Sequence, residues 1–464
     1  MAGSLALKSR KALVLGANPS GFALVRFLIR RGAEVVLADN RASDVVQPLV
    51  AENLDVTKFT LETGEFNPKT FEQVQLVVVT PGLPLDLKIL EQARTAGIPV
   101  MSELEFVSIY TEEPIIAVAG TNGKSTTAAL LGRMLEISGR TIFTNVFSPL
   151  AEYLNKGKAA DYIIAVTNSF QLEGISNFQP KGVIFLNLSE DHANRYPNFE
   201  TYLASYREVL KNVTDESFVA FNAQDPQVVS FVQSIPTNPA KLVFGGGTDF
   251  GPELNSSWGD KTTVSTRVNG KVETFDTKNF RLRGGHNREN LMAAAVTALH
   301  LGAKKAAVQE TVDTFSALPN RVEFVRRINS VAFYNDSSGA NVVATMRTLQ
   351  AFHEPVILIS GGRDKNGDYT PLIPHIRQRV KNLILVGEAK EKFNRAVGDY
   401  TETFLVGTVE EAILLAYQKS RSGDVILFSP GCDSTDVFVN HEERGDKFKN
   451  LVLAISQPRR PNVI

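Results

Sequence analysis

The sequence has little of what marks several large classes of protein. It contains one tryptophan and one cysteine, Cys432, among 464 residues. A single cysteine excludes an internal disulfide. Its formal charge is -1, from 49 basic and 50 acidic residues, so no excess of one sign favours nucleic acid or an anionic membrane. No apolar run approaches the roughly 20 residues of a membrane span. We therefore expect no nucleic acid and no membrane among its partners.

The first residues also lack the long apolar core of a signal peptide. Together with the single cysteine, this absence favours a reducing, cytoplasmic location. Hydrophobic residues make up 43% of the chain and charged residues 21%, as is usual for a compact globular protein. The chain is too long for one hydrophobic core, and about 150 residues per domain predicts roughly three domains.

Short runs rich in valine, isoleucine and leucine alternate with longer helical patterns along the whole chain. This alternation is typical of parallel sheets covered by helices, so the predicted fold class is α/β. The series begins with a strand at 12–15, a helix at 22–31 and a strand at 34–38. Later strands are predicted at residues 115–119, 162–166, 183–188, 218–221, 331–334, 356–359, 383–386 and 425–428, with a β-rich stretch at 262–275.

Two polar segments that contain proline interrupt this series. The first, residues 111–114, comes directly before a new buried strand, and the second, residues 317–321, follows a predicted helix. Proline and the residue before it disfavour a continuing helix, so both segments are natural boundaries. We predict three domains, over residues 1–112, 113–318 and 319–464.

The strongest motif lies between the strand at 115–119 and a helix predicted at 128–137. Residues 120–127 read Gly-Thr-Asn-Gly-Lys-Ser-Thr-Thr. Glycines let backbone N–H groups cradle phosphates, the lysine reaches the β and γ oxygens, and the serine hydroxyl can bind Mg²⁺. The usual spacing has a further glycine at Val118, so the loop is a shortened variant, and a plain turn is the alternative. We expect an ATP site formed by Gly120, Thr121, Asn122, Gly123, Lys124, Ser125 and Thr126.

A second glycine-containing turn, residues 16–21, joins the first strand to the first helix. Asp39 ends the next strand, where the ribose-binding acid of a dinucleotide site would lie. Asn18 replaces the glycine that lets a pyrophosphate approach, which weakens an NAD interpretation. The turn could instead be purely structural, or it could hold the phosphates of another nucleotide.

Two histidines are ambiguous candidates for a functional role. His192 follows the strand predicted at 183–188, where doubly wound domains place their ligands, and His286 comes directly before a predicted helix. A neutral imidazole at His192 could bind or orient a metal ion. A lone histidine is more often a surface or hydrogen-bonded residue, so both interpretations stay open.

In this order and spacing, the motifs resemble those of the Mur ligases. The matching segments cover nearly the whole chain, and Ser-Phe-Gln-Leu-Glu and the late Arg-Gly are typical of the branch that adds D-glutamate. They are residues 120–127, 169–173, 187–192, 286–290, 318–321, 335–337, 361–365, 429–430 and 443–445. The resemblance implies a Rossmann-like N-terminal domain for a UDP-sugar, a central P-loop ATPase-like domain and a C-terminal Rossmann-like domain for the incoming amino acid.

The resemblance also implies a reaction. ATP phosphorylates the carboxylate of UDP-N-acetylmuramoyl-L-alanine, the amine of D-glutamate attacks the acyl phosphate, and phosphate leaves. The implied cofactors are ATP and Mg²⁺. The implied partners are a UDP-sugar precursor of peptidoglycan and an amino acid, and we expect a monomer or the partner of a paralogue.

Site residues follow from the resemblance position by position. Lys124, His192 and Lys365 are the expected catalytic residues, and Ser125 and His192 are the expected metal-side residues. Beside the phosphate loop, the nucleotide is expected to contact Asn287, Arg321 and Asp336. The expected substrate-binding residues are Ser20, Asp39, Asn40, Arg41, Thr80, Gly82, Asn145 and Ser434.

Several positions depart from the family pattern. The metal-binding glutamate of the family falls at Val166, and its carbamylated lysine falls at Tyr206, so neither position offers a carboxylate-like oxygen. Further departures are Asn194, Ser338, Ala340, Thr435, His441 and Phe147. Two alternatives therefore stay open: an ATP- and UDP-sugar-binding protein without ligation, and a ligase for a different amino-acid acceptor.

Overall fold

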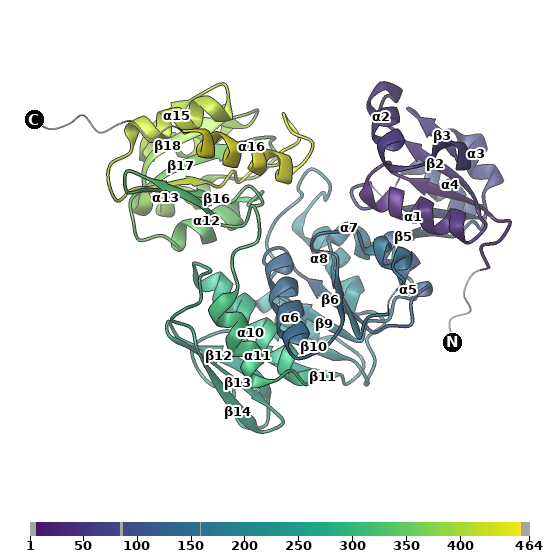
Figure 1. Cartoon of the computed structure of the whole chain (residues 1–464), viewed down its shortest axis with the longest axis horizontal. Coiled ribbons are helices and arrows are strands. Elements are labelled where there is room, and N and C mark those ends of the chain that lie inside the picture. The colour runs from purple at the N-terminus through teal and green to yellow at the C-terminus, as the bar shows by residue number, and fades with distance from the viewer. Residues whose placement is uncertain (1–5, 84–86, 158, 456–464) are drawn as a thin grey trace, which may run out of the picture. The chain divides into compact units, whose positions relative to one another are not determined.

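The structure is a computed structural model that describes residues 6–83, 87–157 and 159–455. It contains three separate sheets, each flanked by helices (Figure 1), which confirms the predicted α/β class and its three-part architecture. No helix in these three ranges is long and apolar enough to cross a membrane.

The first sheet has five parallel strands in the order β3-β2-β1-β4-β5. Its strands are β1 (Lys11–Leu15), β2 (Glu34–Asp39), β3 (Thr60–Thr63), β4 (Leu76–Val79) and β5 (Val100–Ser102). Its helices are α1 (Pro19–Arg30), α2 (Ser43–Asn53), α3 (Pro68–Gln73), α4 (Lys88–Thr95), α5 (Glu103–Ile109) and the 3₁₀ turn η1 (Val56–Lys58). α1 begins three residues before its predicted start, because the Asn18 side chain accepts a hydrogen bond from the Gly21 N–H and Pro19 suits the first turn.

The second sheet has nine strands in the order β14-β13-β12-β11-β10-β9-β6-β8-β7. Its strands are β6 (Ile115–Ala119), β7 (Ile142–Thr144), β8 (Tyr162–Val166), β9 (Gly182–Phe185), β10 (Phe218–Asn222), β11 (Ala240–Phe244), β12 (Asn255–Gly259), β13 (Thr263–Val268) and β14 (Lys271–Asp276). All neighbours are parallel except β12, β13 and β14, which pair antiparallel with one another. The prediction of a strand through residue 188 was wrong at its end, since the backbone of Asn187 turns to bond the loop after β6.

Helices α6 to α11 accompany this second sheet. They are α6 (Lys124–Ile137), α7 (Ser169–Leu172), α8 (Phe199–Arg207), α9 (Pro226–Gln233), α10 (Gly285–His300) and α11 (Lys305–Thr314), with η2 (Leu150–Asn155) and η3 (Glu208–Leu210). α6 begins at Lys124, four residues before the predicted start. Gly123, at φ 91°, turns the chain directly into the helix.

The third sheet has six strands in the order β15-β16-β20-β17-β18-β19, and only β15 runs antiparallel to its neighbour. Its strands are β15 (Glu323–Ile328), β16 (Val331–Asn335), β17 (Val356–Gly361), β18 (Val380–Val386), β19 (Glu402–Leu405) and β20 (Val425–Phe428). Its helices are α12 (Val342–Gln350), α13 (Ile373–Arg379), α14 (Lys390–Val397), α15 (Val409–Lys419) and α16 (His441–Ala454), with η4 (Thr370–Leu372) and η5 (Gly398–Tyr400). Apolar side chains fill both of its faces.

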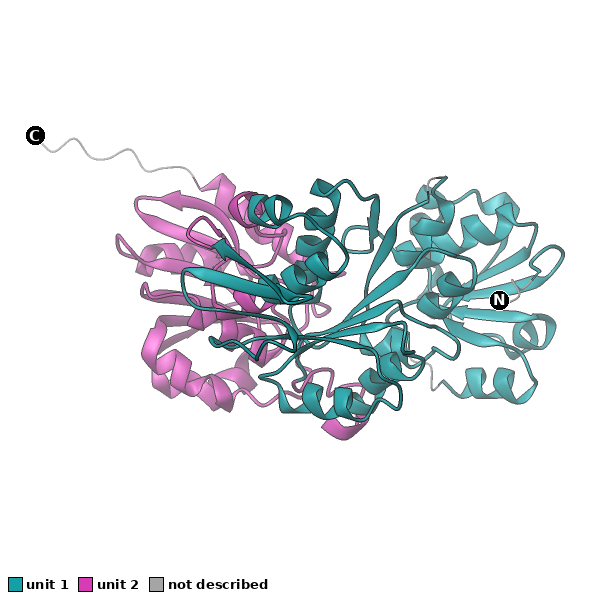
Figure 2. Ribbon diagram, turned by 90° about the horizontal axis from the view of Figure 1, so that it is seen from below, with its two compact units in different colours: residues 1–188, 202–276, 290–311 teal, residues 189–201, 277–289, 312–464 magenta. Residues whose placement is uncertain are grey.

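The chain divides into two compact units (Figure 2): residues 1–188, 202–276 and 290–311, and residues 189–201, 277–289 and 312–464. The first two sheets belong to one unit, and hydrogen bonds join them. Glu105 at the end of the first sheet accepts from the backbone N–H groups of Ser176, Asn177 and Phe178 at 2.9–3.0 Å. The predicted boundaries at 112/113 and 318/319 stay predictions.

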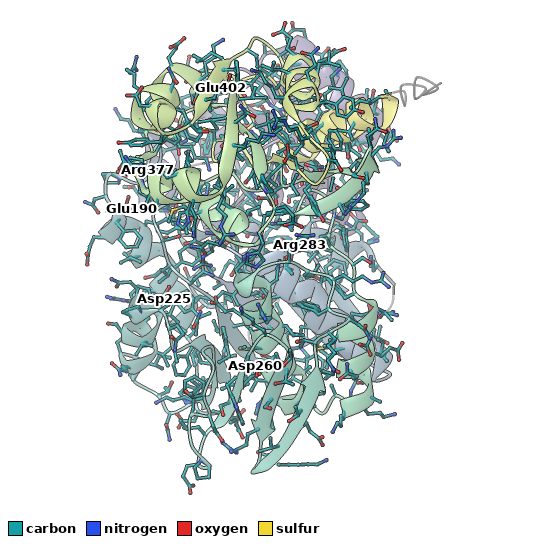
Figure 3. All side chains as sticks on the ribbon, turned by 90° about the vertical axis from the view of Figure 1, so that its left-hand side faces the viewer. Glu190, Asp225, Asp260, Arg283, Arg377 and Glu402 are labelled. Carbon is teal, nitrogen blue, oxygen red and sulfur yellow. The ribbon has the colours of Figure 1, made fainter. Side chains whose placement is uncertain are left out.

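Charged side chains of both signs are spread over the surface. Asp260, Arg377 and Glu402 are exposed examples (Figure 3). Arg283, also labelled there, pairs with Glu354 at 3.0 Å. This mixture agrees with the near-zero net charge of the sequence.

Candidate active site

The phosphate loop follows β6 at the carboxyl edge of the second sheet, and close packing explains its two glycines. Gly120 and Gly123 have φ values of 126° and 91°. A Cβ at Gly120 would lie 2.8 Å from the Asn187 carbonyl oxygen, and one at Gly123 would lie 2.3 Å from Asn290 Oδ1. Only glycine fits either position, so the loop keeps its backbone N–H groups at the start of α6, where anions are favoured.

Lys124 is the first residue of α6, and its ammonium group lies over its own loop. Nζ donates to the carbonyl oxygens of Gly120 at 2.7 Å and Thr121 at 2.9 Å. Ser125 follows it in the first turn of the helix, half-buried. A lysine held at this place can exchange these neutral acceptors for phosphate oxygens, which bind an ammonium group more strongly.

Three neutral side chains from other segments form hydrogen bonds with the phosphate loop. Asn187 accepts from the Asn122 N–H at 3.0 Å and donates to the Asn122 carbonyl oxygen at 2.9 Å. From α8, Tyr206 donates to the Gly120 carbonyl oxygen at 2.9 Å, and Tyr202 hydrogen bonds with the Thr121 hydroxyl at 2.9 Å. Sequence reasoning missed Tyr202 altogether and noted Tyr206 only as a replacement, because these contacts join segments more than 80 residues apart.

Asn145, an expected substrate-binding residue, is engaged by the strand beside the loop. Its Oδ1 accepts from the Val166 N–H at 2.6 Å, and its Nδ2 donates to the Val166 carbonyl oxygen at 3.0 Å. Val166 ends β8 and lies opposite Val118 of β6 in the parallel register. The structure therefore brings Asn145 and Val166 to the edge of the sheet that carries the phosphate loop.

In the first sheet, the turn after β1 gathers several expected UDP-sugar residues. Asp39 accepts from the Ala17 N–H at 2.7 Å and from Arg41 Nε at 2.8 Å, and Arg41 also donates to the Ala17 carbonyl oxygen at 2.8 Å. Thr80 Oγ1 accepts from Asn18 at 2.8 Å. Asp39, Arg41 and Thr80 thus meet at the carboxyl edge of this sheet, where α/β domains bind ligands.

These contacts also determine the charge of Asp39. Burial works to raise its pKa, but the hydrogen bonds from Arg41 and from backbone amides outweigh burial and hold the pKa below its usual range. The ion pair is therefore charged at neutral pH and orders the turn. Asn40 and Gly82 are exposed next to it, and Gly82 has a φ of 102°.

Ser20 lies where the first two sheets meet, beside a buried acid that sequence reasoning missed. Glu103 is 1% exposed, and its Oε1 accepts from the Ala151 N–H at 2.9 Å. Burial raises the pKa of Glu103, although hydrogen bonds with Ala151, Ser20 and Gln171 oppose that rise. Gln171 belongs to the Ser-Phe-Gln-Leu-Glu segment, so this motif reaches the end of the first sheet.

In the other compact unit, three motif segments converge on one buried cluster. Asn335 donates to Asn320 Oδ1 at 2.7 Å and to the Gly445 carbonyl oxygen at 3.2 Å. Arg444, 2% exposed, donates to Ser337 through Nε at 3.0 Å and to the backbone oxygens of residues 337, 432 and 433. The Leu-Pro-Asn-Arg, Asn-Asp-Ser and Arg-Gly segments therefore form a single structural unit.

Lys365 and Asp191 form an ion pair in the same unit. Nζ of Lys365 lies 3.2 Å from Asp191 Oδ1, and Asn341 donates to Asp191 Oδ2 at 2.8 Å. Burial works to raise the pKa of Asp191, yet the charges of Lys365 and His192 and the bond from Asn341 lower it. His192 follows Asp191 with a φ of 56°, which is uncommon for a residue other than glycine.

Ser434 and the three expected nucleotide residues outside the loop also lie in this unit. Ser434 is buried, and its N–H donates to Asp433 Oδ1 at 2.6 Å. Asn287 donates to the Arg283 carbonyl oxygen at 2.7 Å, and Arg321 lies 3.3 Å from the Ser338 hydroxyl. Asp336 accepts from Thr348 at 2.8 Å and Ser429 at 2.9 Å. Their part in holding ATP stays a prediction, because the phosphate loop belongs to the other unit.

The titration of Asp336 gives a testable dependence of stability on pH. Burial raises its pKa from 3.8 to about 6, against opposing hydrogen bonds from Thr348 and Ser429. The folded chain thus keeps this proton where the unfolded chain has lost it, so stability falls as pH rises from about 4 through about 6. Between about pH 4.5 and about pH 8, the free energy of unfolding loses about 2 kcal/mol through this group.

Asp336→Asn removes that titration. As the pH rises over this range, the native chain loses this contribution and the variant does not. We therefore expect the unfolding free energy of the variant, relative to that of the native chain, to increase by about 2 kcal/mol. Urea unfolding at both pH values measures the difference and cancels the titration of all other groups. A difference that is the same at both pH values would contradict the raised pKa.

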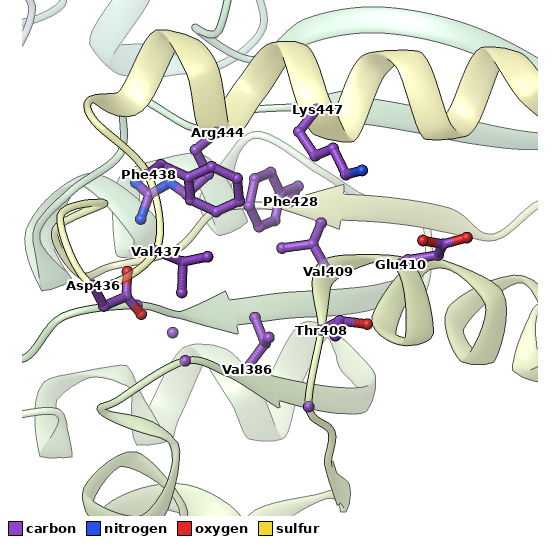
Figure 4. A pocket seen from close by; sticks show the side chains of 14 residues that line it. Val386, Thr408, Val409, Glu410, Phe428, Asp436, Val437, Phe438, Arg444 and Lys447 are labelled. Atoms are coloured by element: carbon purple, nitrogen blue, oxygen red, sulfur yellow. The ribbon is translucent and has the colours of Figure 1, made fainter. Parts of the chain in front are cut away.

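A cavity of about 270 Å³ lies in the third sheet, at the carboxyl ends of β17, β18 and β20. In Figure 4, Phe428, Phe438 and Val437 point toward it, and Asp436 and Lys447 lie on opposite sides. The order of the strands reverses between β17 and β20, which is where open α/β sheets bind ligands. None of the expected site residues lines this cavity.

Models of protein families match three successive stretches of the chain. Residues 10–102 match the Mur ligase MurD-like N-terminal domain, residues 118–298 the Mur ligase middle domain, and residues 320–432 the Mur ligase glutamate ligase domain. The first stretch contains the turn after β1, the second contains the phosphate loop and His192, and the third contains Arg321, Asp336 and Lys365.

Curated proteins and solved structures resemble the chain over nearly its full length. The UDP-N-acetylmuramoylalanine–D-glutamate ligase of Bdellovibrio bacteriovorus is 40% identical over 462 residues, covering 96% of this chain and 98% of that protein. The ligase of the same name from Geotalea uraniireducens is 37% identical over 456 residues, covering 97% and 98%. The pseudomurein peptide ligase type C from Methanothermus fervidus superposes with a TM-score of 0.60 at 18% identity, covering 97% and 100%. The UDP-N-acetylmuramate-alanine ligase of Thermotoga maritima gives 0.61 at 16%, covering 96% and 99%.

Proposed function

The chain belongs to the Mur ligase family, and we propose that it joins D-glutamate to UDP-N-acetylmuramoyl-L-alanine at the expense of ATP. It is an ATP-dependent ligase of peptidoglycan-precursor synthesis, since relatives named for this reaction match it from end to end. The single structural observation that carries the proposal is the phosphate loop at the start of α6, with Lys124 over its carbonyl oxygens.

The reaction needs an activated carboxylate, because a carboxylate and an amine do not condense directly in water. The γ-phosphoryl group of ATP passes to the carboxylate oxygen of the alanyl substrate, giving an acyl phosphate and ADP. The amine nitrogen then forms the amide bond and loses its proton as phosphate leaves. Mg²⁺ bound with ATP neutralises charge on the transferring group.

The chain's own groups serve the first step at the loop. Backbone N–H groups at the start of α6 and the dipole of this helix hold the phosphates, and Lys124 neutralises the β and γ oxygens. We assign the half-buried Ser125 hydroxyl to the cation that accompanies them. Preorganised groups of this kind lower the barrier because they need no rearrangement as charge develops.

The proposed acceptor site contains Lys365 and Ser434, and His192 is the proposed metal-side residue. The Lys365 side chain is 12% exposed and its ammonium group pairs with Asp191, so a carboxylate of D-glutamate meets a cation already held in place. The buried Ser434 offers a hydroxyl group on the segment after β20. We assign the UDP-sugar to the first sheet, at Ser20, Asp39, Asn40, Arg41, Thr80 and Gly82, with Asn145 beside the phosphate loop.

A second candidate function is nucleotide and UDP-sugar binding without ligation. The observation that favours it is the pair Val166 and Tyr206, which offers no carboxylate beside the loop. A ligase with another acceptor is favoured by Ala340, Thr435 and His441. The cytoplasmic location, and a monomer or a complex with a paralogue, complete the proposal.

The deciding experiment measures ADP and phosphate release with ATP, Mg²⁺, UDP-N-acetylmuramoyl-L-alanine and D-glutamate, with mass spectrometry of the products. We expect one phosphate for each amide bond formed. ATP binding without any amide product, with D-glutamate or other amino acids, would support the second candidate. Product with a different amino acid alone would support the third.

A further inference from the structure

Four neutral side chains from elsewhere in the first unit contact the phosphate loop. Asn187 and Asn290 lie against Asn122 and Gly123, and Tyr206 and Tyr202 bond Gly120 and Thr121. These groups fix the shape of the loop through amides and phenols. None of them supplies the anionic oxygen that a divalent cation prefers.

The strand beside the loop is equally without charge at its carboxyl end. Val166 lies opposite Val118, two residues before Gly120, so its side chain position is the nearest of β8 to the loop. Its backbone is fully engaged by Asn145. The next residue, Thr167, turns its hydroxyl to the Val118 carbonyl oxygen at 3.2 Å and is completely buried.

Within the first unit, the described residues named above at the phosphate loop fit one magnesium ion and offer no anionic oxygen for a second. Mg²⁺ prefers a few protein oxygens together with phosphates and water, and the Ser125 hydroxyl with the nucleotide phosphates meets that need. Across residues 6–83, 87–157 and 159–455, no group of three or more His, Cys, Asp or Glu side chains is arranged to hold a metal ion. The valine side chain offers no ligand atom, and the phenol of Tyr206 donates a hydrogen bond to the Gly120 carbonyl oxygen.

We propose that this phosphate loop binds ATP with a single divalent cation, and that Tyr206 and Val166 fill the places from which protein groups would hold a second one. The inference rests on the proposed function only in taking ATP as the ligand. Tyr206 is then a positioning residue, which maintains the loop by its hydrogen bond in place of a metal ion.

The packing around Tyr206 suits a positioning role. Its ring is 2% exposed and meets that of Tyr202 edge-on, at 5.2 Å between centroids and 77° between planes. The ring centroid of Phe185, the last residue of β9, lies 6.1 Å from that of Tyr206. Aromatic contacts of this kind hold both hydroxyl groups at the loop at little entropic cost.

Counting ions at the site tests the proposal on the full chain. Mn²⁺ replaces Mg²⁺ and is counted by electron paramagnetic resonance while a non-hydrolysable ATP analogue saturates the protein. We expect one Mn²⁺ for each bound nucleotide. Two ions with the nucleotide bound would overturn this inference and leave the ligase proposal standing, whereas no nucleotide binding would overturn both.

Two variants sharpen the count. Val166→Glu places a carboxylate at the edge beside the loop, and we expect it to add a second Mn²⁺ at millimolar concentrations. Tyr206→Phe keeps the ring and removes the hydroxyl, so we expect one Mn²⁺ still and a fall in nucleotide affinity of about 3- to 10-fold. A loss of the ion in Tyr206→Phe would show that the phenol is a ligand and would overturn the positioning role.

Discussion

Replacing Lys124 by alanine is expected to weaken ATP binding about 100-fold, because charge-assisted hydrogen bonds to phosphate oxygens are among the strongest in proteins. The ammonium group now lies 2.7 Å and 2.9 Å from two carbonyl oxygens of the loop, so the structure already holds it where phosphates would bind. Ligation should be lost with it, since the phosphate loop would lose its own cation. Isothermal titration with ATP and Mg²⁺ measures the affinity.

The matched control is Lys181→Ala. Lys181 is exposed in the same compact unit, and its ammonium group donates to the Glu216 carbonyl oxygen at 2.9 Å. This variant should bind ATP as the native chain does. Unchanged affinity in Lys124→Ala, with its thermal unfolding also unchanged, would remove the phosphate loop from the ATP site.

Gly445→Ala is expected to destabilise the chain by about 2–3 kcal/mol through overpacking. A Cβ at this position in α16 would lie 1.9 Å from Asn320 Oδ1 and 3.0 Å from Ser337 Cβ. The Asn320 side chain cannot move away without breaking the hydrogen bond that its Oδ1 accepts from the buried Asn335. The substitution therefore opens the cluster in which the three motif segments converge.

Gly132→Ala is the matched substitution, since Gly132 is also a buried glycine inside a long helix, α6. A Cβ there would meet only Ile142 and Ile164 side chains, at 3.7 Å and 3.8 Å. Alanine favours the helix over glycine, so we expect a gain of about 0.5–1 kcal/mol or no change. Thermal unfolding of the two variants measures both effects, and we expect the lower midpoint in Gly445→Ala. Equal midpoints in the two variants would contradict the crowding at Gly445.

Local patterns in the sequence predicted the sheets because buried parallel strands need continuous apolar runs. Ile115–Ala119 and Val356–Gly361 are buried along their whole lengths and were predicted to within two residues. Short or partly exposed strands such as β3 and β19 carry no such run and were missed. Helix starts were misplaced where a cap decided them, as at Asn18 and Gly123.

The site was predictable only where one segment carries the chemistry. Residues 120–127 predict a phosphate loop without help from the rest of the chain, because the glycines, the lysine and the serine are close together in the sequence. Tyr202, Glu103 and Asn290 gain their roles from contacts with residues at least 48 positions away. Spacing along the chain does not predict such long-range contacts, so only the folded structure identifies these residues.

The hydrogen bond from Tyr206 to Gly120 has a consequence for how the site is completed. A lysine at this position, as the family pattern has it, gains its anionic oxygens only after its amine reacts with carbon dioxide. A phenol undergoes no such reaction, and Tyr206 reaches its partner as soon as α8 packs under the loop. This contact with the phosphate loop therefore forms on folding without dissolved carbon dioxide, and we expect bicarbonate depletion to leave nucleotide binding unchanged.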